Sequence, residues 1–389
     1  MLIHELMLRG VLSFGPETAR LEMRPLNVLI GPNGSGKSNL IEAVGLLRSA
    51  AAKLTAPLRG TGGGVREWIW KGNKPGSAQV EAVVDYPRGP QPLRHRIEFT
   101  EAAAQFELLD EFIENQAADP GHAEPFFYYR FQNGRPALSV REGARRQLKR
   151  EDVAPDASIL SQRKDPDQYP ELTYLADVYG RIRLYREWTF GRSSVFRSPQ
   201  AADLPSDRLE EDFSNLGLFL NHLRGEPQAK SIIIGHLRDL YSGIDDFDVR
   251  IKGGTVEVFL TEGSFTIPAS RLSDGTLRYL CLLAILCDPN PPQLVCIEEP
   301  ELGLHPDLLP KIADLLVAAS ERTQLIVTTH SDGLVDALTE CPESVIVVEK
   351  HGGQTAAKRL EVTDALKEWL EKYRLGQLWT RGEIGGTRW

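Results

Sequence analysis

The sequence predicts an α/β protein with a mixed or parallel central sheet, an antiparallel β subdomain and an inserted, mostly helical lobe. Residues 1 to 50 and 268 to 350 combine short apolar strand patterns with helical patterns, which is typical of parallel strands joined by crossover helices. Residues 60 to 140 contain several β-like runs separated by turn formers. The chain has 389 residues, 41% of them hydrophobic, which suffices for one large core or two modest ones.

We divide the chain into three consecutive segments, residues 1–140, 141–245 and 246–389. The first runs from alternating strands through a glycine-rich turn into a helical pattern from Ser38 through Leu47. It continues into the β subdomain, where we expect a helical excursion near residues 101 to 116. The second is the inserted lobe, with helices expected at 209 to 224 and 228 to 241. The third opens on a hairpin or meander at 247 to 269.

The composition restricts both partners and compartment. Lys and Arg number 45 against 54 Asp and Glu, a net charge of -9, so any nucleic-acid site must be a local patch. No apolar run reaches the roughly 18 residues of a membrane span, and the N-terminal stretch lacks the order of a secretory signal. The 4 cysteines form no C-x-x-C pair, and three lie in apolar runs typical of a core. We therefore expect a cytoplasmic protein with no membrane partner.

The strongest motif follows the apolar strand pattern LNVLI and precedes a helical pattern. Residues 31 to 38 match G-x-x-x-x-G-K-[ST] in this required context. Glycines let backbone N–H groups converge on phosphate oxygens, and the helix N-terminus adds favourable partial charge. Lys37 supplies a charge for the β and γ phosphates, and the Ser38 hydroxyl can bind Mg²⁺. The predicted nucleotide-binding residues here are Gly31, Pro32, Asn33, Gly34, Ser35, Gly36, Lys37, Ser38 and Asn39.

Two acids follow a second apolar strand pattern, LVCI. Glu298 and Glu299 come at its carboxyl end, the edge where ligands bind in open α/β sheets. Adjacent strand residues point to opposite sides, so the two carboxylates are expected to do different jobs. One interpretation places Glu298 on the Mg²⁺ side through water and Glu299 beside the attacking water as general base. The alternative is a pair of solvated acids.

Two weaker signals accompany these motifs. His330 ends the strand pattern QLIVTT and could contact a γ-phosphate, although a lone histidine is more often structural. Ser273 and Gly275 precede an apolar helix and could form a second anion site at its N-terminus. The same residues also make an ordinary helix cap and turn. The order of these residues along the chain relative to Glu299 favours a γ-phosphate contact for His330 and an anion site for Ser273 and Gly275.

Together these residues resemble the ABC-type ATPase head, specifically its RecF/SMC-like and OLD-like branch. GPNGSGKSN is similar to the Walker A motif of that family, LSDGT to its signature, LVCIEEPE to its Walker B motif, LGLHPD to its D-loop region and TTHS to its switch histidine. The resemblance covers roughly residues 1 to 50 and 268 to 350. It implies a P-loop NTPase fold and an ATPase that uses ATP and Mg²⁺.

The resemblance also implies a role for each motif. These roles are phosphate and Mg²⁺ binding by Lys37 and Ser38, support of the metal by Glu298, activation of water by Glu299, and γ-phosphate contact by His330. In this family the signature acts in trans. ATP would then lie between Lys37 of one subunit and Ser273 with Gly275 of another, in a homodimer that forms on ATP binding.

Three positions depart from the family pattern. Glu298 stands where most relatives carry Asp, Asp274 replaces the first glycine of the signature, and His305 lies near the usual D-loop aspartate. These departures suggest slow turnover or tuned dimerisation. The stretch after His330 is too short for the TOPRIM nuclease domain of OLD-like proteins, and the sequence has neither sustained heptads nor a C-x-x-C hook. A compact, stand-alone ATPase of this branch is the nearest match.

Two stretches of the second segment suggest what the ATPase acts on. REGARRQLKR, at 141 to 150, is basic, and RIRLYREWTFGRSSVFR, at 181 to 197, interleaves basic residues with aromatics. Such compositions bind phosphate backbones and stack on bases, although a solvated face plus core aromatics explains them too. The first hypothesis is a DNA-associated ATPase of repair, recombination or phage-defence type. The alternative is a nucleotide-switched scaffold that holds or controls a partner nuclease or toxin protein.

Overall fold

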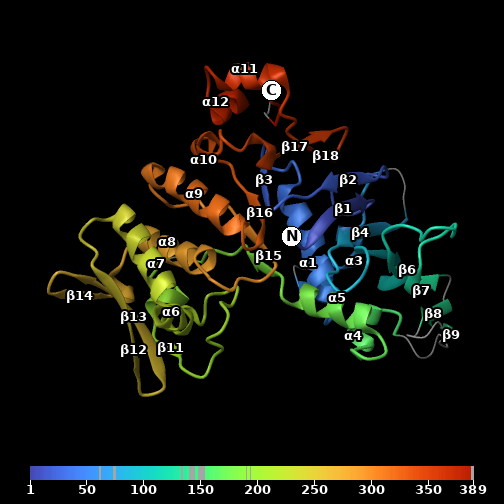
Figure 1. Ribbon diagram of the computed structural model, residues 1–389, viewed down its shortest axis with the longest axis horizontal. Helices are drawn as coiled ribbons and strands as arrows, with labels where there is room; N and C mark the ends of the chain where they lie inside the picture. The colour runs from blue at the N-terminus through green and yellow to red at the C-terminus, as the bar shows by residue number, and fades with distance from the viewer. Residues whose placement is uncertain are drawn as a thin grey trace. The chain divides into compact units, whose positions relative to one another are not determined.

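The computed structural model describes residues 1–60, 63–72, 76–132, 135–139, 145–147, 154–189, 191–192 and 194–386, and the chain divides into two compact units (Figure 1). Unit 1 comprises Met1–Ile182, Glu343–Glu361 and Ile384–Trp389, and unit 2 comprises Arg183–Pro342 and Val362–Glu383. Each unit is therefore assembled from separated stretches rather than from consecutive segments. Strand pairing is one reason, because β17 (Val345–His351) pairs in parallel with β3 (Leu26–Ile30) in unit 1.

Unit 1 contains an eight-stranded antiparallel sheet, as expected of a β subdomain. In spatial order its strands are β2 (Ala19–Glu22), β1 (Ile3–Arg9), β4 (Ala78–Val84), β5 (Leu93–Ala102), β6 (Gln105–Asn115), β7 (Phe127–Gln132), β8 (Arg135–Ser139) and β9 (Arg145–Gln147). Along the first eight residues of β5, buried side chains alternate with partly exposed ones. Along β5 one face of the sheet is thus buried and the other partly exposed, whereas β4 is buried on both faces.

The expected helical excursion near residues 101 to 116 is wrong. β5 and β6 form a hairpin whose turn places Ala103 and Ala104 at φ 50° and 62°. β6 also pairs with β7 on its other side. The Glu- and Leu-rich composition of this stretch suits a helix, but two neighbouring strands satisfy its backbone, and Phe106 and Ile113 are buried. Tertiary pairing therefore overrides local propensity.

The strand, turn and helix predicted near the N-terminus are confirmed. β3 is buried along its whole length and leads through a loop into α1 (Lys37–Ala50). β17 pairs with β3 in parallel and with β18 (Gln354–Arg359) antiparallel. Helix α1 packs against α2 (Ala56–Gly60), α4 (Ile159–Gln162) and α5 (Pro170–Gly180), and the short helix α3 (Val65–Trp68) packs against α2.

Unit 2 contains the parallel strands β10 (Arg183–Tyr185), β15 (Leu294–Glu298) and β16 (Gln324–Thr328), in that order. Helix α9 (Leu309–Ser320) connects β15 to β16 and packs against β16, as a crossover helix should. Helix α8 (Asp274–Leu286), which precedes β15, packs against α9. Parallel pairing brings the carboxyl ends of β15 and β16 to the same edge.

The remaining elements of unit 2 agree in part with the sequence. Strands β12, β13 and β14 form the meander expected at 247 to 269. The second expected helix is confirmed, but the first begins only at Leu216, and residues 209 to 215 are not helical. The inserted segment is also not wholly helical, because it supplies β10. The bounds are β11 (Gln200–Ala201), β12 (Asp246–Lys252), β13 (Thr255–Glu262), β14 (Phe265–Pro268), α6 (Leu216–Gly225), α7 (Pro227–Leu240), α10 (Asp332–Ala337), α11 (Asp364–Leu370) and α12 (Leu375–Thr380).

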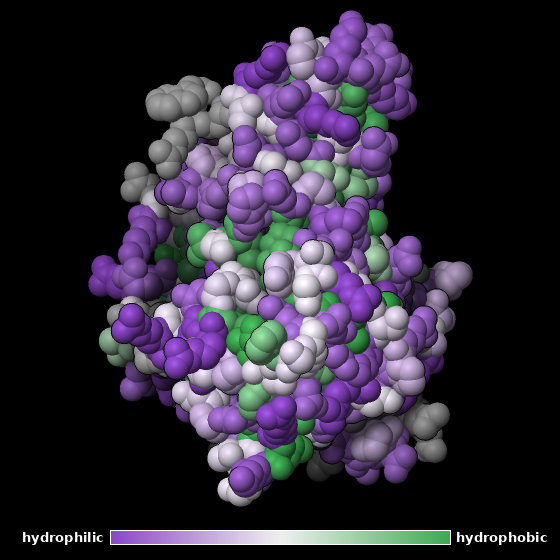
Figure 2. All heavy atoms as spheres, turned by 90° about the vertical axis from the view of Figure 1, so that its left-hand side faces the viewer, coloured by the Kyte–Doolittle hydropathy of each residue, from purple (hydrophilic) through white to green (hydrophobic). Residues whose placement is uncertain are grey.

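Large apolar side chains are exposed at a few points of unit 2, including Phe265 and Tyr241. Figure 2 shows that hydrophobic side chains on the face it presents form small areas broken up by hydrophilic ones. Among the described residues, none of the helices has the length and apolar character needed to cross a membrane. Three of the cysteines, Cys281, Cys287 and Cys296, are buried as the sequence suggests.

Candidate functional site

The loop between β3 and α1 needs its glycines. Gly31, Gly34 and Gly36 have φ of 147°, 77° and 109°, values that favour glycine over residues with a side chain. A Cβ on Gly31 would lie 2.0 Å from the backbone oxygen of Val348 in β17, and one on Gly36 would lie 2.2 Å from Oγ1 of Thr355 in β18. The loop therefore lies against β17 and β18, and positions 31 and 36 have no room for a side chain.

Polar side chains of unit 1 brace this loop. Thr355 Oγ1 donates to the backbone oxygen of Ser35 at 2.6 Å, and it also lies 2.6 Å from Ser13 Oγ, whose hydroxyl can donate back to it. Ser13 Oγ also accepts a hydrogen bond from Asn39 Nδ2 at 2.6 Å. The sequence predicts Asn39 as a nucleotide-binding residue, but it gives no sign of Ser13 and Thr355. A contact across 342 positions, such as Ser13 with Thr355, leaves no local signal in the sequence.

Lys37 lies at the first turn of α1 with its ammonium group turned toward the loop. Its Nζ donates to the carbonyl oxygens of Gly31, at 2.8 Å, and Pro32, at 3.1 Å. Lys37 is buried, whereas the neighbouring Ser38 is exposed at the surface of unit 1. A positive charge, a helix N-terminus and N–H-rich backbone thus occur together, which is the chemistry that holds a phosphate.

Glu298 and Glu299 have different partners in unit 2. Glu298 Oε1 accepts a hydrogen bond from Arg186 Nε at 2.8 Å, and its backbone oxygen accepts one from Trp188 Nε1 at 2.7 Å. Glu299 Oε1 lies 3.6 Å from His330 Nε2, at the end of the neighbouring strand. The structure therefore brings Glu299 and His330 together, and it gives Glu298 a guanidinium neighbour that the sequence did not reveal.

The backbone of Glu299 is strained and held from two sides. Its φ is 47°, in the left-handed region that costs a non-glycine residue about 1–3 kcal/mol. Its N–H donates to the backbone oxygen of Thr328 at 3.0 Å, and its own backbone oxygen accepts from Arg278 Nη2 at 2.8 Å. Such strain persists only where surrounding contacts enforce it, and it is commonest at functional sites.

Arg278 is the buried charge of this region. It is 3% exposed, its guanidinium lies 4.4 Å from the ring centroid of Trp188, and burial lowers its pKa to about 10. Arg278 is the single basic residue in the apolar helix pattern TLRYLCLLAILC. A lone charge in such a pattern is the signal that could have identified it, because a buried cation requires dedicated partners.

A third acid positions the histidine. Glu301 Oε1 accepts hydrogen bonds from Thr329 Oγ1 at 2.7 Å and from the backbone N–H of His330 at 3.0 Å. Glu301 thereby ties the loop after β15 to the loop after β16, whose first residues carry the histidine. The sequence contains this acid within the motif EEPE, but nothing local distinguishes it from the other two.

Ser273 is the N-cap of α8, which is the ordinary role considered for it. Its Oγ accepts from Thr276 N at 3.0 Å. Asp274 is bonded to the guanidinium of Arg197 and to Gly191 N, and the hydrogen bond from Arg197 holds the Asp274 pKa below its usual range. Ser273 and Asp274 are exposed, so the signature loop lies at the surface of unit 2.

The aromatic and basic stretch at 181 to 197 is buried in part. Tyr185 and Phe196 are 3% and 5% exposed and pack against the ring of Phe213. These two rings are unavailable for stacking on bases, and the Arg186 and Arg197 side chains bond to Glu298 and Asp274. Fewer of these side chains are thus available to nucleic acid than the sequence suggests, but the Arg181 side chain is 68% exposed, and DNA association stays a prediction. The other basic stretch, 141 to 150, lies outside the residues whose side chains the structure describes.

The fold of the two units and the phosphate loop define an ABC-type P-loop ATPase head. Over residues 26–336 the chain matches, and it belongs to, the family described as "AAA domain, putative AbiEii toxin, Type IV TA system". Proteins of this class bind ATP. His305, near the expected D-loop, is the N-cap of the short helical turn Pro306–Leu308.

Solved structures of SMC heads share the fold. An SmcHead bound to the C-winged helix domain of ScpA has a TM-score of 0.60 and 14% identity, covering 93% of this chain and 99% of that chain. A second SMC head, from Pyrococcus furiosus and bound to the C-terminal domain of ScpA, has a TM-score of 0.60 and 14% identity, covering 95% and 98%. No curated protein matches the chain.

Proposed function

We propose that this chain binds and hydrolyses ATP with Mg²⁺, and that two copies share the nucleotide head to tail. The observation that carries the proposal is the glycine loop before α1, held against β17 and β18 with Lys37 buried beneath it. The strained Glu299 beside His330 supplies a candidate for the chemical step. Membership of an ABC-type ATPase family supports both parts.

Each catalytic group has a distinct task in this proposal. Lys37 binds the β and γ phosphates, and Glu299 takes a proton from the attacking water. His330 contacts the γ-phosphate, and the separation of 3.6 Å between its Nε2 and Glu299 Oε1 suits two groups acting on one water and one phosphate. Glu301 fixes the His330 backbone, so it is a positioning residue.

Two side chains could bind Mg²⁺ through oxygen, the Ser38 hydroxyl and the Glu298 carboxylate, and the carboxylate already has a second partner. The Ser38 hydroxyl is exposed on the first turn of α1, where a P-loop serine holds the ion. Glu298 would support the metal, but its Oε1 is bonded to Arg186, so the acid divides its charge between two cations. When bound, Mg²⁺ would supply positive charge that neutralises the negative charge developing on the phosphate.

The shared site requires the signature of a second copy. Ser273 and Gly275 would face the phosphates bound by the other head, at the N-terminus of α8. Asp274 is exposed and acidic, which would repel a phosphate. The ion pair between Asp274 and Arg197 offsets that charge, which supports a weakened contact between the signature loop and the phosphates of the other copy.

We propose that the ATP-bound dimer controls a partner protein. The family description names a toxin–antitoxin system, and SMC heads of the same fold have been solved with a bound ScpA domain. DNA association is the second candidate. It is now less supported by residues 181 to 197, because Tyr185 and Phe196 are buried. A stoichiometric protein that co-purifies without nucleic acid favours control of a partner, and salt-dependent DNA binding favours the alternative.

Two variants test the site. Lys37→Ala should abolish ATP binding, whereas Glu299→Gln should keep binding, lose hydrolysis and accumulate as a dimer visible by light scattering. Mixing Lys37→Ala chains with Ser273→Arg chains should restore activity, because one composite site is then intact. Hydrolysis by Glu299→Gln at the parental rate would reject the general base, and failure of every mixture would reject the shared site.

A further inference from the structure

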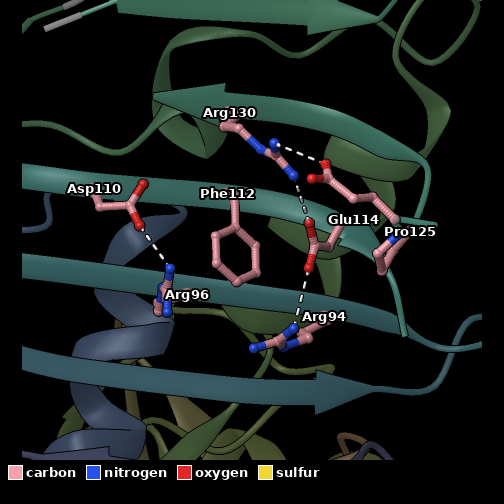
Figure 3. Close-up of a pocket in the computed structure, with 8 residues that line it drawn as sticks. Arg94, Arg96, Asp110, Phe112, Glu114, Pro125 and Arg130 are labelled. Atoms are coloured by element: carbon pink, nitrogen blue, oxygen red, sulfur yellow. Dashed lines mark hydrogen bonds and ion pairs between the residues drawn. The ribbon is translucent and has the colours of Figure 1, made fainter. Parts of the chain in front are cut away.

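The solvent-facing side of the eight-stranded sheet carries a pocket of about 260 Å³ that the ATPase proposal does not use (Figure 3). Arg94 and Arg96 from β5 and Arg130 from β7 line it around the ring of Phe112, which comes from β6 between them. All of these residues belong to unit 1.

Buried carboxylates hold the arginines in place from below. Glu114 Oε1 accepts from Arg94 and its Oε2 accepts from Arg130, each at 3.2 Å, so one acid sets the spacing of two guanidinium groups. Arg94 also bonds to Glu81 at 2.5 Å. The side chains of Glu81 and Glu114 are 2% and 5% exposed, whereas those of Arg94 and Arg130 are 33% and 32% exposed. The outer surface of the pocket therefore presents guanidinium groups.

Aromatic rings fix the orientation of the guanidinium groups further. Arg96 and Arg94 lie 4.4 Å and 5.1 Å from the centroid of Phe112, and Arg130 lies 5.0 Å from that of Phe127. Stacked guanidinium groups keep their N–H edges available for acceptors. A guanidinium has five N–H donors, more than these carboxylates use. The pocket has spare donors in a prearranged layout.

One exposed acid already approaches this layout from outside. Glu124, whose side chain is 76% exposed, places a carboxylate oxygen 3.6 Å from Arg130 Nη1. It comes from the loop before β7, next to Pro125 in the pocket wall and to Phe126, which is 43% exposed. Glu124 shows which chemistry this position accepts, namely a carboxylate from a peptide chain with an apolar side chain nearby.

The charge balance favours a peptide over a nucleic acid. The three arginines are matched by the buried acids Glu81, Asp110 and Glu114, so the pocket is close to neutral before Glu124 is counted. The whole chain carries a net charge of -9. A polyphosphate backbone gains no long-range attraction here, whereas a single carboxylate gains short, charge-assisted hydrogen bonds.

We propose that this pocket binds an acidic segment of a partner protein, with an Asp or Glu side chain replacing Glu124 on Arg130. The inference concerns a surface apart from the ATP-binding loop, and it does not require the chain to hydrolyse ATP. It supplies a docking position for the partner considered above, and it can fail while the ATPase proposal stands.

The test measures binding of a fluorescein-labelled hexapeptide with a single glutamate next to a phenylalanine and otherwise alanine, by anisotropy, without nucleotide, at low and physiological salt. Glu124→Gln should tighten binding about threefold, because it removes an exposed competing ion pair. Arg130→Gln should weaken binding about tenfold, the size of a lost charge-assisted hydrogen bond. Arg181→Gln is the matched control, since Arg181 is an exposed arginine of unit 1 paired with Asp177 on α5, and it should change nothing.

Several results would overturn the proposal. They are no binding of the single-glutamate peptide to the parental protein, equal losses for Arg130→Gln and Arg181→Gln, or no gain for Glu124→Gln. Thermal unfolding checks that Arg130→Gln is folded, and Glu124→Gln keeps the test decisive if it is not, because Glu124 is exposed. A labelled hexathymidylate that binds more tightly than the peptide, and loses affinity in Arg130→Gln, would instead assign the pocket to a phosphate backbone.

Discussion

Replacing Arg278 by methionine separates stability from catalysis. Burial lowers the Arg278 pKa from 12.5 to about 10, which corresponds to about 3 kcal/mol of destabilisation of the charged group. Against this stand the hydrogen bond to the Glu299 backbone oxygen, about 1.5–3 kcal/mol, and the stacking on Trp188, about 1–2 kcal/mol. The opposing contributions nearly cancel. Arg278→Met should therefore change the free energy of unfolding by no more than about 2 kcal/mol.

The same substitution should strongly slow hydrolysis. Glu299 holds its φ of 47° partly through Arg278, and without that bond the residue can relax by the roughly 1–3 kcal/mol of strain. A displaced general base should reduce kcat about 10- to 100-fold, with ATP affinity unchanged. Steady-state kinetics, ATP-analogue binding and thermal unfolding measure the three quantities.

The control is Arg322→Met, which removes an arginine that caps backbone oxygens of Leu286 and Ala318 away from Glu299. It should keep the parental kcat. A folded Arg278→Met protein with parental kcat would show that the contact to Glu299 has no part in the chemistry, and a loss matched by Arg322→Met would attribute the effect to unit 2 as a whole.

Three further predictions concern single contacts. Gly36→Ala should abolish nucleotide binding while the sheets stay folded by circular dichroism, because its Cβ would lie 2.2 Å from a threonine hydroxyl of β18 at a φ of 109°; normal ATP binding would contradict the loop geometry. Arg186→Gln should lower by about fivefold the Mg²⁺ concentration needed for half-maximal binding of a fluorescent ATP analogue, because Glu298 loses a competing cation; an unchanged Mg²⁺ titration would show that Glu298 takes no part in metal binding. Arg197→Gln should weaken ATP-dependent dimerisation in the Glu299→Gln background, measured by light scattering, because Asp274 is then unneutralised; an equal dimer fraction would place the signature outside the interface.

The sequence predicted those parts of the site that one strand, turn and helix can build alone. The glycines before α1 are required by backbone φ values, and Lys37 follows them directly, so a motif of eight residues carries the information. Likewise Glu299 and His330 could be anticipated at one sheet edge, since each ends an apolar strand pattern and parallel strands align their ends.

Local sequence could not predict the contacts that depend on register between distant strands. Arg186 and Glu298 meet across 112 positions because β10 pairs with β15, and that pairing gives one arginine of the basic stretch a carboxylate partner. The β6 strand was mistaken for a helix for a related reason, because its neighbours rather than its composition determine its conformation.

The local sequence by itself thus determined the phosphate-binding motif, because backbone φ preferences and neighbouring charges act over only a few positions. Tertiary structure decided which side chains surround them, which arginines are buried and which surface presents guanidinium groups. The physical reason is that burial and ion pairing are properties of side chains brought together by folding, and a buried charge such as Arg278 is tolerated only where distant residues supply its partners.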